Sequence, residues 1–172
     1  MSFMGALKSS LSGRLWPAVE HSLRTALAAG LSLGLAELLR LPAPYWAPIT
    51  AVVIMQSTLG AAWTVSVQRF AGTIIGAAAG ALVAPVFGAN PFAFTLGVFL
   101  LGLLCAALRV DNSAYRFAGI TLAIVMIIPH KFPAWVTALN RFLEVSVGIL
   151  VALALTYLWP ESSPLKNSQP NK

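Results

Sequence analysis

Long stretches without a charged residue constrain this chain more than any other feature of its sequence. The run TLGVFLLGLLCAAL, residues 95–108, has no charge and no alternation of apolar and polar side chains. Over the 172 residues, 58% are hydrophobic and only 9% are charged. A helix needs roughly 20 apolar residues to cross the hydrocarbon layer, and lipid tolerates only helices or closed barrels. Barrel strands alternate in polarity, so the sequence predicts an all-α membrane protein.

The apolar segments fall into six predicted transmembrane helices. Their expected ranges are 23–40, 45–60, 67–87, 92–109, 114–129 and 138–159. The breaks between them contain proline, glycine or polar residues, which interrupt helices. The six helices form one predicted membrane domain over residues 23–159, followed by a polar tail, residues 160–172, that we expect to be disordered. The preceding segment, residues 1–22, is either an amphipathic helix at the membrane surface or a disordered tail.

The basic residues indicate an orientation rather than a nucleic-acid partner. The formal net charge is +6, but the Lys and Arg side chains lie singly near the ends of the expected spans and form no basic patch. With the N-terminus in the cytoplasm, eight of these residues lie inside and three outside. The inner set is Lys8, Arg14, Arg24, Arg69, Arg109, Arg116, Lys166 and Lys172, and the outer set is Arg40, Lys131 and Arg141. The positive-inside rule therefore predicts that both termini are cytoplasmic.

The chain resembles itself at a distance of about 70 residues. YWAPITAVVIM resembles YRFAGITLAIVM, and Arg-Phe recurs 72 residues later. The matched pairs are Ile49-Thr50 with Ile120-Thr121, Met55 with Met126, Arg69-Phe70 with Arg141-Phe142, and Gly76 with Gly148. Because each copy would hold three spans, the second copy would enter the membrane from the opposite side. The pattern predicts a 3+3 inverted repeat with a substrate path at the repeat interface, although membrane sequences can also resemble each other by chance.

Arg69 and Arg141 are candidate anion-binding residues. An arginine at the bilayer centre costs roughly 2.5–3.5 kcal/mol on insertion scales, so its presence within a span calls for a reason. A guanidinium stays charged and binds a carboxylate with two parallel hydrogen bonds. The alternative is that each side chain extends to the lipid headgroups. Both arginines share a helix face with small residues that let helices approach closely. These packing residues are Gly72, Gly76, Gly80 and Gly148.

Other polar residues within the spans are further candidates. Glu144 takes the place that Gly72 has in the first copy, three residues after Arg141, so it is either an ion-pair partner or a proton-coupling carboxylate. The substrate could also accept hydrogen bonds from Thr50, Thr121 and Gln56. The few acidic residues and histidines are scattered, and the single cysteine excludes a disulfide. We therefore expect no enzymatic activity, no metal and no cofactor.

Residues 45–84 resemble the membrane domain of the FUSC family of fusaric-acid-resistance proteins and aromatic-acid exporters. The residues that carry the resemblance are Tyr45-Trp46-Ala47, Thr50-Ala51, Gln56-Ser57, Arg69, Gly72, Thr73 and Gly76. In the second copy, Arg141 and Gly148 match a weaker motif of the same family. The resemblance extends over most of residues 22–159.

This resemblance implies a multi-pass protein of the bacterial inner membrane. It implies a transporter or channel for organic, and more specifically aromatic, carboxylate anions, with efflux as the direction and a homodimer as the assembly. Many members carry a duplicated membrane domain or a large cytoplasmic domain, neither of which is found in this sequence. The alternative is a non-transporting membrane subunit that scaffolds or regulates a larger assembly.

Overall fold

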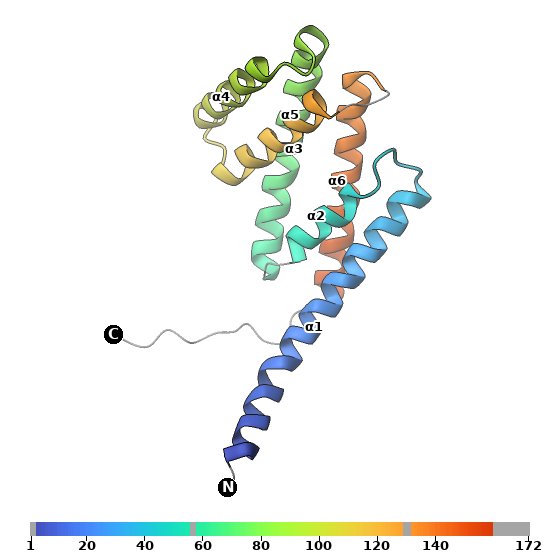
Figure 1. Cartoon of the computed structure of the whole chain (residues 1–172), viewed down its shortest axis with the longest axis vertical. Coiled ribbons are helices and arrows are strands. Elements are labelled where there is room, and N and C mark those ends of the chain that lie inside the picture. The colour runs from blue at the N-terminus through green and yellow to red at the C-terminus, as the bar shows by residue number, and fades with distance from the viewer. Residues whose placement is uncertain (1–2, 56–57, 129–131, 160–172) are drawn as a thin grey trace, which may run out of the picture.

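In the computed structural model, the described residues of the chain form a bundle of six helices (Figure 1). The structure describes residues 3–55, 58–128 and 132–159, and no strand occurs in these ranges. The helices are α1 (Phe3–Leu38), α2 (Trp46–Met55), α3 (Leu59–Phe87), α4 (Pro91–Ala107), α5 (Asn112–Ile127) and α6 (Ala134–Leu158). The predicted all-α class is therefore confirmed for the described residues. Gln56 lies outside them.

The helices differ in length more than the sequence analysis predicted. Within the described ranges, two helices are long and apolar enough to cross a membrane, Gly60–Phe87 and Ala134–Leu158. The shorter apolar helices are α2, α4 and α5, with 10, 17 and 16 residues. A helix rises 1.5 Å per residue, so α2 alone extends only about 15 Å. Six complete crossings therefore remain a prediction.

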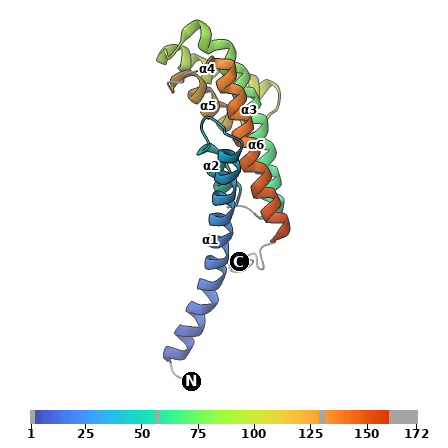
Figure 2. The same cartoon turned by 90° about the vertical axis from the view of Figure 1, so that its right-hand side faces the viewer.

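The connection between α2 and α3 comes earlier than the sequence analysis placed it. The second span was expected to continue to residue 60, but α2 ends at Met55, and α3 begins at Leu59 rather than at residue 67. Thr58 has extended backbone angles (φ −63°, ψ 163°) and precedes the first turn of α3. The small residues after it continue the helix instead of interrupting it. At the N-terminal end of the chain, α1 is one continuous helix, and its first part projects beyond the other helices (Figure 2).

The helices pack in a crossed arrangement. α3 lies along both α5 and α6, whereas α2 packs on α6 and α1, and α4 packs chiefly on α5. Glycines make two of these contacts possible, because an added Cβ at Gly76 would collide with the carbonyl of Ala118 in α5, and one at Gly148 would collide with the carbonyl of Ala47 in α2. Gly72 and Gly80 are likewise buried against α5. Backbones that approach this closely are typical of membrane helices.

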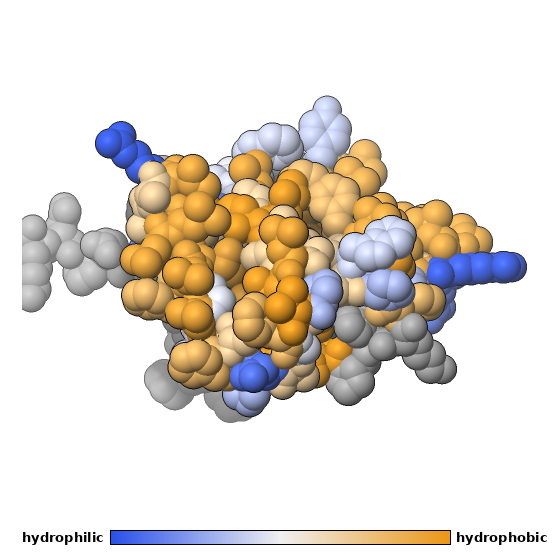
Figure 3. All heavy atoms as spheres, turned by 90° about the horizontal axis from the view of Figure 1, so that it is seen from above, coloured by the Kyte–Doolittle hydropathy of each residue, from blue (hydrophilic) through white to orange (hydrophobic). Residues whose placement is uncertain are grey.

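The outer surface of the bundle is apolar. Large hydrophobic side chains are exposed on the long helices as well as on the short ones, including Leu31, Leu82, Phe92 and Leu150. Seen from above the view of Figure 1, apolar residues cover most of the face in Figure 3. The buried residues are smaller and include many alanines. A surface this apolar is suited to lipid rather than to water.

Candidate functional site

The two arginines of the repeated motif are buried inside the bundle. Arg69 of α3 is 6% exposed and Arg141 of α6 is 3% exposed. The next residue of each helix, Phe70 and Phe142, form an aromatic pair with ring centroids 5.0 Å apart. α3 and α6 therefore meet at this level. Side chains that extended to lipid headgroups would be exposed, so both arginines instead serve contacts within the protein.

Arg69 links α3 to α2 and α5. Its Nε donates a hydrogen bond to Thr50 Oγ1 at 3.2 Å, and Thr50 is itself fully buried. Its Cζ lies 4.8 Å from the centroid of the Phe117 ring. The guanidinium thus has an aromatic face on one side and a hydroxyl oxygen at its edge. Such stacking partly offsets the cost of removing the charge from water.

Arg141 has a richer set of partners. Its Cζ lies 3.8 Å from the centroid of the Trp46 ring, and its Nη1 is 3.3 Å from Oε2 of Glu144. The other carboxylate oxygen of Glu144 accepts a hydrogen bond from the backbone N–H of Ala43 at 3.0 Å, and Glu144 is only 1% exposed. Nε of Arg141 is buried and has no hydrogen-bond acceptor among the described residues. This N–H of the guanidinium therefore has no partner among the described residues.

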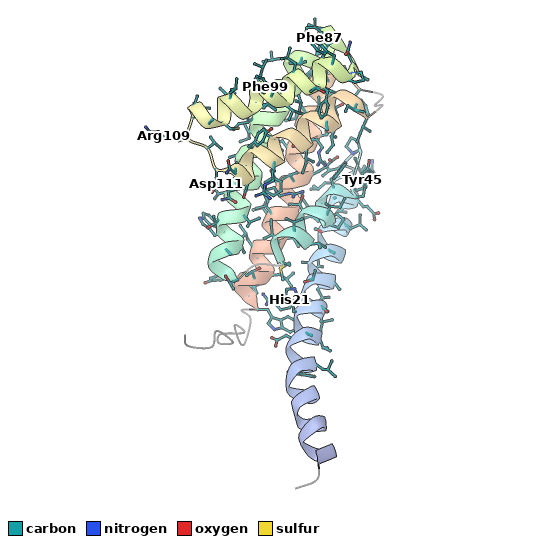
Figure 4. The ribbon with its side chains drawn as sticks, turned by 60° about the vertical axis from the view of Figure 1, so that its left-hand side comes forward. His21, Tyr45, Phe87, Phe99, Arg109 and Asp111 are labelled. Atoms are coloured by element: carbon teal, nitrogen blue, oxygen red, sulfur yellow. The ribbon has the colours of Figure 1, made fainter. Side chains whose placement is uncertain are left out.

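A cavity of about 330 Å³ lies beside Arg141. It is lined by the α1–α2 connection, the start of α2, the end of α5, Phe132 and the start of α6; Tyr45 on its border is labelled in Figure 4. The lining residues are Pro42, Ala43, Tyr45, Trp46, Ile124, Ile128, Phe132, Thr137, Asn140, Arg141 and Glu144. The cavity thus combines aromatic and aliphatic walls with a small polar group on α6. This is the usual composition of a small-molecule site.

Two other cavities lack such a polar group. One of about 280 Å³ lies between α4 and α5, and one of about 630 Å³ lies near the ends of α3 and α5 and the start of α6. Neither is lined by a charged residue. The cavity beside Arg141 is therefore the better candidate for an anionic ligand.

The sequence profile of a protein family described as "Fusaric acid resistance protein-like" matches residues 7–155. The chain belongs to this family. The "Uncharacterized transporter YdhK" of Escherichia coli K12 is 34% identical to the chain over 152 residues, which are 83% of the chain and 23% of YdhK. "Inner membrane protein YeeA" of the same strain is 29% identical over 147 residues, 83% of the chain and 41% of YeeA. No solved structure matches the chain.

Membership of the fusaric acid resistance protein-like family agrees with the two spanning-length helices and the apolar outer surface, and makes the chain a membrane protein. The FUSC resemblance noted in the sequence is confirmed by the match. The chain spans about a quarter of the length of YdhK. The activity of these longer relatives as whole proteins is therefore only a proposal for this chain.

The structure brings some of the candidate residues of this family member together and separates others. Arg141 and Glu144 line the cavity, whereas Arg69 and Thr50 bond to each other outside its lining. Thr121 is buried, donates its hydroxyl to the carbonyl of Phe117 at 3.0 Å, and does not line the cavity either.

Sequence reasoning missed several residues of the cavity wall. Thr137 lies four residues before Arg141, and Asn140 lies four residues before Glu144, so helical spacing from these two candidates would have placed them on the same side of α6. Trp46 stacks on Arg141. The similarity between the two halves of the sequence could have identified this contact. Phe117, which stacks on Arg69, lies 71 residues after Trp46.

Proposed function

We propose that this protein carries organic carboxylate anions, aromatic ones in particular, across the bacterial inner membrane in the outward direction. The observation on which this proposal depends is a buried guanidinium that stacks on Trp46 and lines a cavity of about 330 Å³ with a donor still unpaired among the described residues. The names of YdhK, a transporter, and YeeA, an inner membrane protein, agree with this function and location.

The walls of the cavity favour an aromatic acid. The carboxylate of such a ligand would accept hydrogen bonds from Arg141, because a guanidinium stays charged even when it is buried. Asn140 and Thr137 offer additional donors beside it. The ring would contact the side chains of Tyr45 and Phe132 on the walls. Because the cavity has one polar and one apolar end, it would bind amphipathic monocarboxylates in preference to inorganic anions.

The crossed contacts support the proposed inverted repeat. Arg69 stacks on Phe117 of α5, and its counterpart Arg141 stacks on Trp46 of α2. The glycines make contacts between the same two pairs of helices. Gly76 of α3 packs against Ala118 of α5, and Gly148 of α6 packs against Ala47 of α2. Each pair is related to the other by an offset of 71 or 72 residues. We place the pseudo-two-fold axis between the rings of Phe70 and Phe142, which touch each other.

Further residues would act on the transported anion or on a coupled proton. Arg69, which is hydrogen-bonded to Thr50 and is followed by the Phe70 that contacts Phe142, would stabilise the anion on its way between the two sides, with Thr121 as the counterpart of Thr50. Glu144 would carry a proton with the substrate, since it is a buried carboxylate beside the anion site. The distribution of Lys and Arg favours cytoplasmic termini, and the family resemblance favours a homodimer.

The test is flux of radiolabelled benzoate into proteoliposomes that contain the purified chain. We expect Arg141→Gln to lower the initial rate at least tenfold, and Arg69→Gln to lower it as well. Arg109→Gln is the matched control, because Arg109 is exposed and its side chain extends away from the bundle in Figure 4. A well-folded wild-type protein without carboxylate flux would contradict the proposal and favour the non-transporting subunit.

A further inference from the structure

The two arginine sites differ at one position. Three residues after Arg69 stands Gly72, which packs against the backbone of Ala114 in α5. Three residues after Arg141 stands Glu144, whose carboxylate is 3.3 Å from the guanidinium and almost completely buried. Arg69 therefore has a hydroxyl and a ring as neighbours, whereas Arg141 has a carboxylate of the protein itself. This carboxylate lies beside the guanidinium that a ligand carboxylate would need.

The same carboxylate also holds one wall of the cavity. Oε1 of Glu144 accepts the backbone N–H of Ala43 at 3.0 Å, and Ala43 belongs to the α1–α2 connection that lines the cavity. Glu144 thus contacts Arg141 with one oxygen and the connection with the other. Any movement that takes Glu144 away from Arg141 must strain or break the contact with Ala43, or carry the α1–α2 connection with it.

The net charge of the Arg141–Glu144 pair determines how a ligand carboxylate can bind in this cavity. Arg141 contributes one positive charge and Glu144 one negative charge, so the buried pair is already neutral. A second carboxylate would place two negative charges around one guanidinium in a site with little water, where like charges repel strongly. As long as Glu144 is charged, the incoming anion therefore replaces it as the partner of Arg141 rather than joining it.

We propose that Glu144 is a specificity-determining residue that competes with the substrate carboxylate for Arg141. The inference rests on the proposed carboxylate site at Arg141. The competitor keeps the affinity low enough for release, which every conduction or transport site requires. Ligand entry frees Glu144 from Arg141 and, through Ala43, shifts the α1–α2 connection. Glu144 is a positioning residue in this scheme, because it acts on the ligand through Arg141.

The test is a binding titration of the full chain in nanodiscs with benzoate, followed by tryptophan fluorescence. Trp46 in the cavity wall supplies the signal, and a Trp46→Phe variant assigns it. We expect Glu144→Gln, which keeps an acceptor for Ala43 but loses the charge, to lower the Kd for benzoate about tenfold or more. Glu144→Asp restores the charge and should return the Kd toward the wild-type value. Glu37→Gln changes an exposed carboxylate in α1 and is the matched control, expected to leave the Kd unchanged.

Two outcomes would overturn the inference. One is a monodisperse, folded Glu144→Gln protein that binds benzoate no more tightly than the wild type, or does not bind it. The other is equal tightening of the neutral analogue benzamide, because competition for Arg141 should act on the anion alone. Binding is measured without flux, so a protein that binds as expected but does not transport would refute the proposed function and support this inference. Normal flux with an unchanged Kd in Glu144→Gln would refute the inference and the proton-carrying role of Glu144, but not carboxylate transport through the site at Arg141.

Discussion

The pair between Arg141 and Glu144 should show strong energetic coupling in a double-mutant cycle. Both side chains are buried, and Nη1 of Arg141 is 3.3 Å from Oε2 of Glu144. Removing one partner of a buried pair leaves an uncompensated charge, which costs about 3–5 kcal/mol of unfolding free energy. We expect losses of this size for Arg141→Gln and for Glu144→Gln separately.

The double variant should lose much less than the sum of the two single variants. It leaves no unpaired charge, and its main loss is the stacking of the guanidinium on Trp46, worth about 2 kcal/mol in a desolvated setting. The assay is equilibrium unfolding in mixed micelles of dodecyl maltoside and sodium dodecyl sulfate. The double variant should also be inactive in benzoate flux, because the anion-binding guanidinium is gone. Single losses that add within about 0.5 kcal/mol would refute the reasoning.

Two further predictions concern packing and orientation. Gly76→Ala should lower the unfolding free energy by about 1–3 kcal/mol, because its Cβ meets the backbone of α5, whereas Gly34→Ala, with open space around it, should be neutral or slightly stabilising in the same assay. In a Cys105→Ser background, an impermeant thiol reagent added outside should label Arg40→Cys and not Arg109→Cys, and the reverse pattern would contradict the predicted cytoplasmic termini.

The sequence predicted the class of the fold because that depends on composition and local pattern. Uncharged apolar runs specify helices in lipid, whatever those helices pack against. Helix ends were predicted less well, because the few polar residues before Leu59 gave a weaker signal in the sequence than the glycine and small residues after it. Those later residues are helical. The i, i+3 spacing of Arg141 and Glu144 indicated that they could pair, and they do so.

The cavity could not be predicted from local pattern. Trp46 and Arg141 come from the first and second halves of the chain, and they meet because α2 packs on α6. The wall formed by Pro42 and Ala43 depends on the path of a connection, which the periodicity of the helices does not specify. The proposed repeat pointed to these rings, since Trp46 and Phe117 occupy matching positions in the two similar segments of the sequence. Only the crossed packing shows that each ring faces the arginine of the other half.

The most direct test of the account is the distance between a bound carboxylate and the guanidinium of Arg141. It can be measured by solid-state NMR on the protein in lipid, with benzoate labelled with ¹³C in its carboxylate and arginine labelled with ¹⁵N in its side chain. We predict a carboxylate carbon within about 4 Å of guanidinium nitrogens, with the dipolar coupling lost in Arg141→Lys. Bound benzoate without coupling to any arginine, or with coupling that persists in Arg141→Lys, would contradict the account.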